Sequence, residues 1–283
     1  MTGAVGLPSG RAGRPVVMGV VNVTPDSFSD GGAWFQPSDA LEHGRVLRAQ
    51  GADVLDVGGE STRPGAERPS EAEELRRVLP VVEALAELGP VSVDTMRSGV
   101  AAAALDAGAT LVNDVSGGLA DPEMVPLVAE REVPLVVMHW RGHSTSMQSR
   151  AVYGDVVADV RRELAERVEA IEAAGVPRSR LVLDPGFGFA KTAAHNWEVL
   201  RRLGELVDLG LPVLVGTSRK AFLGRVGRAA GAERAPLERD VATAVTTAYA
   251  AGCGAWGVRV HDVAAAVDAL DVAQALMADG EPE

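Results

Sequence analysis

A chain of 283 residues, 47% of them hydrophobic, is long enough to bury a large core as one α/β barrel or as two ordinary domains. Its net charge of −12 argues against a nucleic-acid or membrane surface, because both reward an excess of lysine and arginine. The lone cysteine, Cys253, has no partner for an internal disulfide, and no apolar run approaches a membrane span. A cytoplasmic, enzyme-sized protein is therefore expected.

Eight short segments rich in valine, isoleucine and leucine read as buried parallel strands. They cover residues 16–23, 53–57, 91–93, 110–112, 134–138, 181–183, 212–215 and 255–260. Helical patterns separate them, and no shift in composition marks a second domain. We therefore expect a single-domain α/β fold, a closed (β/α)8 TIM barrel over residues 15–277, in preference to a doubly wound open sheet. Residues 1–14 are expected to form a flexible leader, and residues 278–283 a flexible acidic tail.

Local signals mark several helix boundaries. Ser70 with Glu73 predicts a capping box, and Asp121 followed by Pro122 predicts an N-cap with proline at the first helical position. Helical spacing also covers residues 155–174 and 239–251. Helix ends are expected at five glycines that suit a left-handed residue, Gly51, Gly89, Gly108, Gly175 and Gly252. Residues 141–154 and 224–238 are expected to be mobile loops.

Polar side chains follow the third, fourth and sixth predicted strands. Asp94, Asn113 and Asp184 would meet at one face of a barrel, where the C-terminal strand ends gather. Two carboxylates and an amide can bind a flat heterocycle with several N–H donors on its edge, because a carboxylate accepts two parallel N–H bonds. The alternative is that each side chain caps the turn after its own strand.

Cationic or titratable side chains follow the second, seventh and eighth strands, namely Arg63, Lys220, Arg259 and His261. Residues 259 and 261 are two apart, so in extended chain their side chains point to one side. The four residues predict a pocket for phosphate or pyrophosphate. The alternative is that they form structural ion pairs with Asp94 or Asp262.

Weaker signals lie in the glycine-rich loops. Asn22 ends the first strand, where one amide oxygen would suit a magnesium ion that arrives with a pyrophosphate, although asparagine at a turn usually has a local role. Phe28, Phe187 and Phe189 lie beside glycines near the predicted mouth, and stacking on a planar ligand competes with core packing for each. There is no nucleophile elbow, Cys/His metal spacing or P-loop lysine motif.

Seven of these segments resemble the successive motifs of dihydropteroate synthase: NVTPDSFSDGG, DVGGESTRPGA, SVDTMR, NDVSGG, DPGFGFAKT, GTSRKAFLG and GVRVHDV. The resemblance spans residues 16–273 and implies a (β/α)8 barrel that forms a homodimer, uses Mg²⁺ and serves folate biosynthesis. It implies a transferase that condenses 6-hydroxymethyl-7,8-dihydropterin diphosphate with 4-aminobenzoate to give 7,8-dihydropteroate and pyrophosphate. Inhibition by sulfonamides, which mimic 4-aminobenzoate, is implied as well.

The resemblance also assigns roles to residues. The pterin would be held by Asp94, Asn113, Asp184 and Lys220, with Met138 packed on its face. The diphosphate would lie among Thr62, Arg63, Arg259 and His261. The 4-aminobenzoate would be framed by Phe28, Pro64, Phe189 and Lys220, and Asn22 would contact magnesium. The catalytic residues would be Arg63, Asp94, Lys220 and Arg259. The loops 22–32 and 61–66 would close over the site and exclude water.

The implied chemistry is a dissociative, SN1-like substitution. An arylamine is already neutral at pH 7, so the harder task is loss of pyrophosphate, which a cationic pocket and magnesium would stabilise while Asp94 stabilises the pterin cation. Two positions depart from the family pattern. Ala221 replaces a frequent hydroxyl residue, which is expected to weaken a contact to the aminobenzoate carboxylate, and Trp140 replaces a common methionine. A non-catalytic pterin-binding paralogue and a pterin-dependent methyltransferase remain as alternatives on the same barrel.

Overall fold

A parallel barrel forms the centre of the computed structural model, which describes residues 6–24, 37–60, 68–143, 147–229 and 231–277. The strands are β1 Val16–Asn22, β2 Val54–Gly58, β3 Val91–Asp94, β4 Leu111–Asp114, β5 Leu135–Met138, β6 Leu181–Asp184, β7 Leu214–Val215 and β8 Gly257–Val260. They pair in parallel in the order β6-β5-β4-β3-β2-β1-β8-β7. An isolated parallel bridge between Leu183 and Val213 joins the two ends of the sheet and closes the barrel. The predicted (β/α)8 barrel is confirmed.

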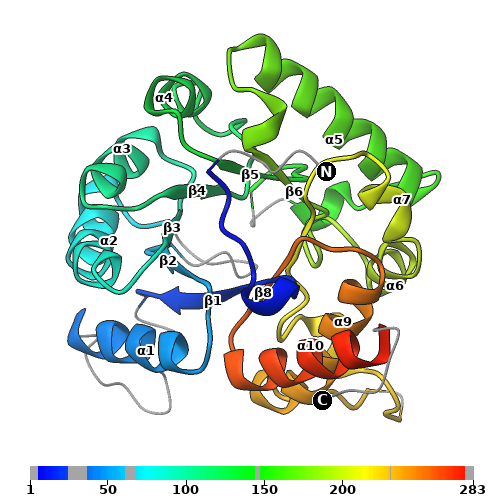
Figure 1. The fold of residues 1–283 in the computed structure, drawn as a ribbon. Helices are drawn as coiled ribbons and strands as arrows, with labels where there is room; N and C mark the ends of the chain where they lie inside the picture. Colours follow the sequence, from blue (N-terminus) through cyan, green and yellow to red (C-terminus); the bar gives the residue numbers. More distant parts are fainter. Residues whose placement is uncertain (1–5, 25–36, 61–67, 144–146, 230, 278–283) are drawn as a thin grey trace.

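Helices surround the strands on the outside of the barrel (Figure 1). The α-helices are α1 Pro37–Ala49, α2 Glu71–Ala86, α3 Ser98–Asp106, α4 Met124–Arg131, α5 Val156–Ala173, α6 Ala193–Arg201, α7 Gly204–Val207, α8 Ala221–Gly224, α9 Asp240–Gly252 and α10 Val263–Met277. Short 3-10 helices are η1 Arg11–Gly13, η2 Met147–Arg150, η3 Arg178–Arg180 and η4 Pro236–Arg239. Of the stretches predicted to be loops, residues 141–154 contain η2, and residues 224–238 overlap α8 and η4.

Local helix signals were only partly right. Ser70 accepts a hydrogen bond from the Glu73 amide, but the Glu73 carboxylate binds Arg76 and Arg77 and does not complete a capping box. Asp121 does not begin α4, which starts at Met124. Its carboxylate instead accepts hydrogen bonds from the amides at the start of α3 and at residue 123.

Four of the five predicted helix-ending glycines adopt a positive φ, Gly51, Gly89, Gly108 and Gly175. Gly252 is different, because α9 runs through it to the cap residue Cys253, and the left-handed turn falls at Gly254. The predicted end of this helix was therefore two residues too early.

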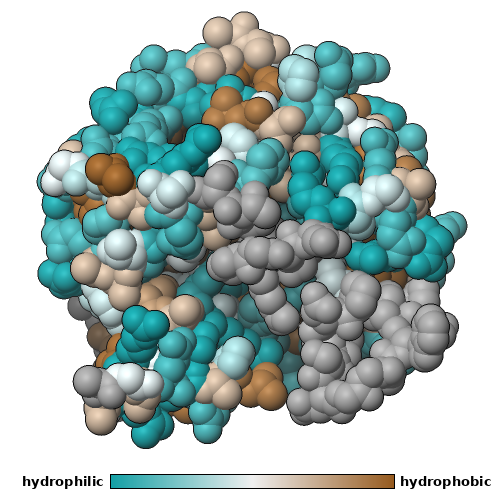
Figure 2. All heavy atoms as spheres, turned by 180° about the vertical axis from the view of Figure 1, so that it is seen from behind, coloured by the Kyte–Doolittle hydropathy of each residue, from teal (hydrophilic) through white to brown (hydrophobic). Residues whose placement is uncertain are grey.

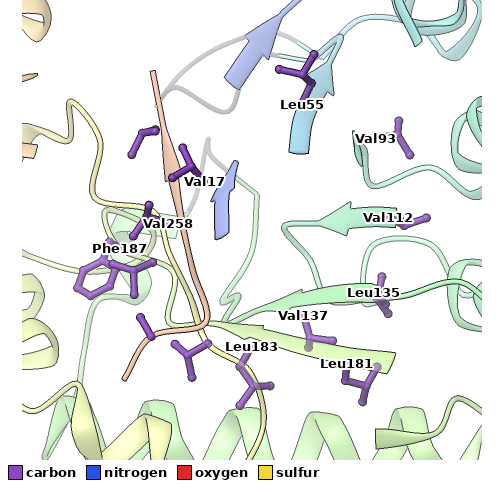
Figure 3. Packing of buried hydrophobic residues seen from close by; sticks show 14 of the residues in the cluster. Val17, Leu55, Val93, Val112, Leu135, Val137, Leu181, Leu183, Phe187 and Val258 are labelled. Carbon is purple, nitrogen blue, oxygen red and sulfur yellow. The ribbon is translucent and has the colours of Figure 1, made fainter. Parts of the chain in front are cut away.

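The side chains of the strands alternate between two buried layers. One layer, with members such as Val17, Leu55 and Val93, packs between the strands and the helices (Figure 3). The other is a small apolar cluster inside the barrel, made of Val16, Met18, Val54, Leu111, Val136, Val182 and Leu214. The interior positions nearer the C-terminal strand ends are therefore left to other residues, and most of these are polar.

A buried ion pair lies at the opposite end of the barrel, where β1 and β2 begin. Arg14 is 6% exposed and donates from Nη1 to Asp53 Oδ2 at 2.8 Å and from Nη2 to the Gly51 carbonyl at 2.9 Å. Asp53 Oδ2 also accepts a hydrogen bond from the Val17 amide at 2.9 Å. This pair ties the segment before β1 to the start of β2, remote from the C-terminal strand ends.

Candidate active site

A polar layer lies directly above the apolar interior of the barrel. On four strands, the residue two positions after an interior valine or leucine also faces the interior. These residues are Asp56 on β2, Asn113 on β4, Met138 on β5 and Asp184 on β6. Asp94 pairs in register with Asn113, and Met138 pairs with Asp184. The period of two along each strand therefore brings these side chains to one end of the barrel.

Arg259 lies at the centre of this layer and binds two carboxylates. Its Nε donates to Asp56 Oδ2 at 2.6 Å, and its Nη2 donates to Asp94 Oδ2 at 2.7 Å. Asn113 Nδ2 donates to the same Asp56 oxygen at 3.0 Å. The ion pair of Arg259 with Asp94, which the sequence suggested as the alternative to a phosphate pocket, is thus present in the structure. The pairing still leaves Nη1 of the guanidinium outside these contacts.

Asp56 was not among the predicted site residues, although it is fully buried and joins β2, β4 and β8 through its contacts. Its second oxygen, Oδ1, has no hydrogen-bond partner in the described part of the chain. A signal was present in the sequence, because an aspartate interrupts the apolar run of β2 two residues after Val54. Buried carboxylates of this kind need partners, and here a cation supplies one.

Burial governs the charge of this cluster. Desolvation raises the pKa of Asp94 to about 7, although the charge of Arg259 acts in the opposite direction. Burial would lower the pKa of Arg259, but the carboxylates of Asp56 and Asp94 outweigh it and raise the pKa. The guanidinium therefore stays charged, and burial makes the Asp94 carboxyl harder to ionise than an exposed aspartate.

Asp184 and Arg259 lie at the same end of the barrel, on either side of β7. A Cβ atom placed on Gly216, just after β7, would lie 3.7 Å from Asp184 Oδ2 and 4.0 Å from Arg259 Cβ. Asp184 Oδ1 accepts a hydrogen bond from the Gly186 amide at 2.7 Å. Burial raises the pKa of Asp184, while that amide and the charge of Lys220 favour its ionised form. A small bicyclic molecule can therefore contact both groups.

Lys220 adds a second cation beside Asp184. Its Nζ lies 4.3 Å from the centre of the Phe189 ring, a cation–π contact. Burial, followed by repulsion from Arg259, lowers the pKa of Lys220 to about 8. Ala221 begins α8 directly after it and is exposed.

His261 follows β8 and is oriented by Ser218. The Ser218 hydroxyl lies 2.9 Å from His261 Nδ1 and accepts a hydrogen bond from the His261 amide at 3.1 Å. Lys220, Arg259 and His261 therefore lie at neighbouring strand ends, as predicted. Their role toward a diphosphate stays a prediction.

Several predicted site residues fall outside the described residues, namely Phe28, Thr62, Arg63 and Pro64. The predicted closing loops 22–32 and 61–66 are largely or wholly outside them as well. Phe187 is 1% exposed and stacks on Phe222 with the ring centroids 6.3 Å apart, so it belongs to the core and not to a ligand platform. Phe189 is only partly buried and keeps the predicted position at the mouth.

Asn22 is the last residue of β1 and is partly buried. Within the described ranges, no group of three histidine, cysteine, aspartate or glutamate side chains could hold a metal ion. A single amide oxygen nevertheless fits magnesium, which usually keeps water and substrate phosphates as its other ligands. The donor set therefore suits a metal carried in by a diphosphate more than a resident one.

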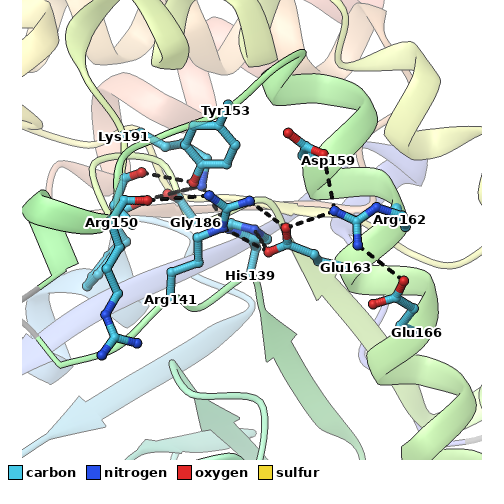
Figure 4. Close-up of polar contacts among 12 residues, drawn as sticks. His139, Arg141, Arg150, Tyr153, Asp159, Arg162, Glu163, Glu166, Gly186 and Lys191 are labelled. Atoms are coloured by element: carbon cyan, nitrogen blue, oxygen red, sulfur yellow. Dashed lines mark hydrogen bonds and ion pairs between the residues drawn. The ribbon is translucent and has the colours of Figure 1, made fainter.

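A second polar network lies behind the mouth, between β5, α5 and the loop after β6 (Figure 4). Lys191 Nζ contacts His139 Nδ1 at 3.0 Å, and His139 Nε2 contacts Glu163 Oε2 at 2.9 Å. Arg141 also donates to Glu163 and lies over the Tyr153 ring at 3.9 Å. None of these residues was predicted from the sequence. Trp140, the unusual residue beside them, packs edge-on against His143.

The described surface on the face behind that of Figure 1 is mainly hydrophilic, with hydrophobic residues scattered over it (Figure 2). Across the described ranges, every helix is too short or too polar to cross a bilayer.

A closed parallel barrel with carboxylates, an amide and cations at its C-terminal mouth defines an enzyme of the barrel class that binds a polar small molecule. The model of the family described as pterin binding enzyme matches residues 18–261. The chain belongs to this family, and it is similar to proteins that are named dihydropteroate synthase.

Three relatives illustrate the match. The dihydropteroate synthase of Mycobacterium leprae is 56% identical over 267 residues, which cover 93% of this chain and 94% of that protein. The Xanthomonas albilineans dihydropteroate synthase solved with 4-aminobenzoic acid is 48% identical, with a TM-score of 0.87 and 94% of each chain covered. The same enzyme in complex with 7,8-dihydropteroate gives 46% identity and a TM-score of 0.83, covering 94% of this chain and 95% of that one. The resemblance to dihydropteroate synthase is confirmed.

Proposed function

We propose that this chain condenses 6-hydroxymethyl-7,8-dihydropterin diphosphate with 4-aminobenzoate to give 7,8-dihydropteroate and pyrophosphate. The observation that carries the proposal is the placement of Asp184 and Arg259 at the same end of the barrel. One group accepts N–H bonds and the other binds oxyanions, so a molecule with a heterocycle and a diphosphate can engage both. Relatives solved with 4-aminobenzoate and with 7,8-dihydropteroate support the same reaction.

The pterin is held by the carboxylate side of the mouth. Asp184 accepts the N–H edge of the heterocycle, since two carboxylate oxygens match two parallel donors. Asn113, fixed by its bond to Asp56, contributes an amide that both donates and accepts. Met138 is 4% exposed and pairs in register with Asp184, so its thioether can pack on the ring face.

The diphosphate is bound by the cations at the ends of β7 and β8. Arg259 is oriented by Asp56 and Asp94, which hold two of its nitrogens and direct the guanidinium across the barrel. His261 is fixed by Ser218. Arg63 and Thr62 are proposed to complete this pocket from the second loop.

Catalysis consists of stabilising charge as the bond between the exocyclic methylene carbon and the diphosphate oxygen breaks. The electron pair leaves with pyrophosphate, and the positive charge spreads into the dihydropterin ring. Arg259 stabilises the departing anion and Asp94 the cation, each in a geometry set before reaction. One well-placed group of this type contributes roughly 3–4 kcal/mol to lowering the barrier.

The arylamine nitrogen then attacks the methylene carbon, forms the C–N bond and releases a proton to solvent. Lys220 and Phe189 frame this second substrate, with the ammonium suited to its carboxylate and the ring suited to its aromatic face. Phe28 and Pro64 are proposed to line the other side. No strong general base is required, because the arylamine is neutral at pH 7.

Magnesium is proposed as the cofactor, with Asn22 as its protein ligand. Bound with the diphosphate, it would neutralise part of the charge on the leaving group. Asn22 ends β1, next to β2 and β8 in the sheet, so its amide lies at the same end of the barrel as Arg259.

A homodimer is proposed from an apolar surface on two neighbouring helices. On α9, Val241 and Val245 are 78% and 66% exposed, and on α10, Val272 and Leu276 are 60% and 82% exposed. Such a group of exposed side chains suits a second copy of the same chain. Sedimentation of the wild-type protein and of Val245→Glu tests this, because only the wild type should dimerise.

A cytoplasmic location is proposed from the lone cysteine, Cys253, and can be checked by cell fractionation.

Arylamine-dependent release of pyrophosphate tests the function. The protein is mixed with dihydropterin diphosphate and magnesium, and pyrophosphate is measured with and without 4-aminobenzoate. Release that requires the arylamine supports the synthase. Pterin binding without release would instead identify a non-catalytic paralogue.

A further inference from the structure

Lysine is almost absent from this chain. Of its 27 lysine and arginine residues, 25 are arginine, and only Lys191 and Lys220 are lysine. The two side chains differ chemically, because arginine is a planar fork that stays charged, whereas lysine is a compact ammonium with three N–H donors. The chain therefore has an ammonium side chain at only two positions, Lys220 at the mouth and Lys191 directly behind it. Lys220 belongs to the proposed arylamine pocket, which leaves Lys191 unexplained.

Lys191 is enclosed by three acceptors. It is 4% exposed, and its Nζ lies 3.0 Å from His139 Nδ1, 3.1 Å from the Gly186 carbonyl and 3.3 Å from the Phe189 carbonyl. These contacts use all three N–H bonds of an ammonium. Burial lowers the pKa of Lys191 to about 7, although Asp184 favours the charged form.

Two of these acceptors, the Gly186 and Phe189 carbonyls, belong to a loop with an unusual backbone. Gly186, Gly188 and Ala190 have φ values of 69°, 79° and 46°, so every second residue is left-handed, and one of them is an alanine. The Tyr153 hydroxyl donates to the Ala190 carbonyl at 2.9 Å. The loop therefore directs two of its carbonyls, those of Gly186 and Phe189, toward the Lys191 ammonium.

His139 links this loop to helix α5. Burial, followed by the charge of Lys191, lowers the pKa of His139 to about 4, so its ring is neutral. Because an ammonium can only donate, Nδ1 accepts from Lys191, and Nε2 carries the hydrogen that faces Glu163. Burial opposes ionisation of Glu163, but hydrogen bonds from His139 and Arg141 lower its pKa. The tautomer of His139 is thus fixed from both sides (Figure 4).

We propose that Lys191 is a positioning residue for the arylamine pocket. By binding the carbonyls of Gly186 and Phe189, it keeps the loop packed against Lys220. The Lys220 ammonium contacts the Phe189 ring, and Lys220 Cδ lies 3.0 Å from where a Cβ atom on Gly188 would be. The backbone of Asp184 is held within the sheet, since the His139 amide donates to its carbonyl, although the Gly186 amide of the same loop also donates to the Asp184 carboxylate. The identity of the arylamine rests on the proposed function, whereas the contact with Lys220 does not.

The first test compares KM values. Lys191→Met keeps the apolar stem and removes the donors. It should raise KM for 4-aminobenzoate at least about tenfold and KM for dihydropterin diphosphate by a clearly smaller factor, because the sheet still holds the Asp184 backbone. The matched control is Arg14→Met, which removes a buried cation at the opposite end of the barrel. It should lower the melting temperature and leave both KM values unchanged. An equal rise in both KM values for Lys191→Met, or no rise in either, would overturn the proposal.

Two further variants sharpen the result. Lys191→Arg should not restore the KM, because a planar guanidinium is too long for acceptors 3.0–3.3 Å from Nζ, and restoration by arginine would refute the need for an ammonium. If Lys191→Met does not fold, His139→Ala removes one acceptor and keeps the cation. His139→Ala should also raise KM mainly for 4-aminobenzoate, by a smaller factor than Lys191→Met. Unchanged KM values would count against the proposal.

An experiment without substrate tests the positioning role of Lys191 independently of the proposed function. With only two lysines, the acylation rate of Lys220 can be followed by peptide mass spectrometry. The rate should rise at least about fivefold in Lys191→Met, because the loop no longer covers Lys220. An unchanged rate would overturn the positioning role. Absence of turnover in the wild type would defeat the proposed function but leave this readout intact.

Discussion

Removing the negative charge of Asp56 should impair both folding stability and turnover. Asp56 is fully buried, and its Oδ2 accepts hydrogen bonds from Arg259 at 2.6 Å and from Asn113 at 3.0 Å. In Asp56→Asn, an amide replaces the carboxylate, so Arg259 keeps only Asp94 as a charged partner. The contact that orients the guanidinium across the barrel then becomes weaker, because it loses its ionic part.

The expected magnitudes follow from these contacts. Removing one partner of a buried ion pair costs about 3–5 kcal/mol in the free energy of unfolding. We expect the lower end, about 3 kcal/mol, because asparagine still accepts one hydrogen bond and Arg259 still has Asp94. Displacing one preorganised donor from a transition state costs roughly 10²–10³-fold in kcat, and we expect about a hundredfold here.

Urea unfolding and arylamine-dependent pyrophosphate release measure the two effects on the same preparation. Asp53→Asn is the matched control, because Asp53 forms a buried pair with Arg14 at the other end of the barrel. It should lose comparable stability and keep kcat within about twofold. The reasoning is refuted if Asp56→Asn retains kcat within about threefold, or if both variants lose activity equally.

Three further results are expected at the mouth. Asp184→Ala should abolish pterin binding in calorimetry, because the heterocycle loses its paired acceptor, and near-normal affinity would contradict that role. Burial lowers the pKa of Lys220 to about 8, so its charge is lost as the pH rises from 7 to 9. KM for 4-aminobenzoate should rise across that range, and a Lys220→Met variant should show no such dependence; a flat wild-type profile would argue against the contact. Ala221→Ser should lower the same KM roughly threefold to tenfold by adding a hydroxyl donor, in keeping with a net hydrogen-bond contribution of about 1 kcal/mol. An unchanged KM would place residue 221 outside the pocket.

The strands were predictable because they are short, apolar and buried on both faces. Each predicted segment agrees with a strand to within two residues at either end. Helix boundaries were less reliable wherever a tertiary contact competed with a local one. Glu73 binds two arginines in preference to a capping amide, and the Asp121 carboxylate reaches the start of α3.

Part of the candidate site was visible from the sequence. Side chains just past a strand end, such as Asp94 and Asp184, were found because a barrel gathers those ends. Asp56 escaped because it lies inside an apolar run, where an aspartate resembles an interruption in a strand. Lys191 escaped because two of its three acceptors are backbone carbonyls, whose direction depends on loop geometry. No sequence pattern specifies that direction.

The junction between β6 and β7 gives the barrel one weak seam. A single isolated bridge joins these strands, and β7 contains only two residues. Backbone amides along this seam should therefore exchange with solvent before those of β1 or β2. Asp184 is the last residue of β6, and Gly216 directly follows β7. Local opening between these two strands would therefore widen the mouth while the remaining strands keep their register.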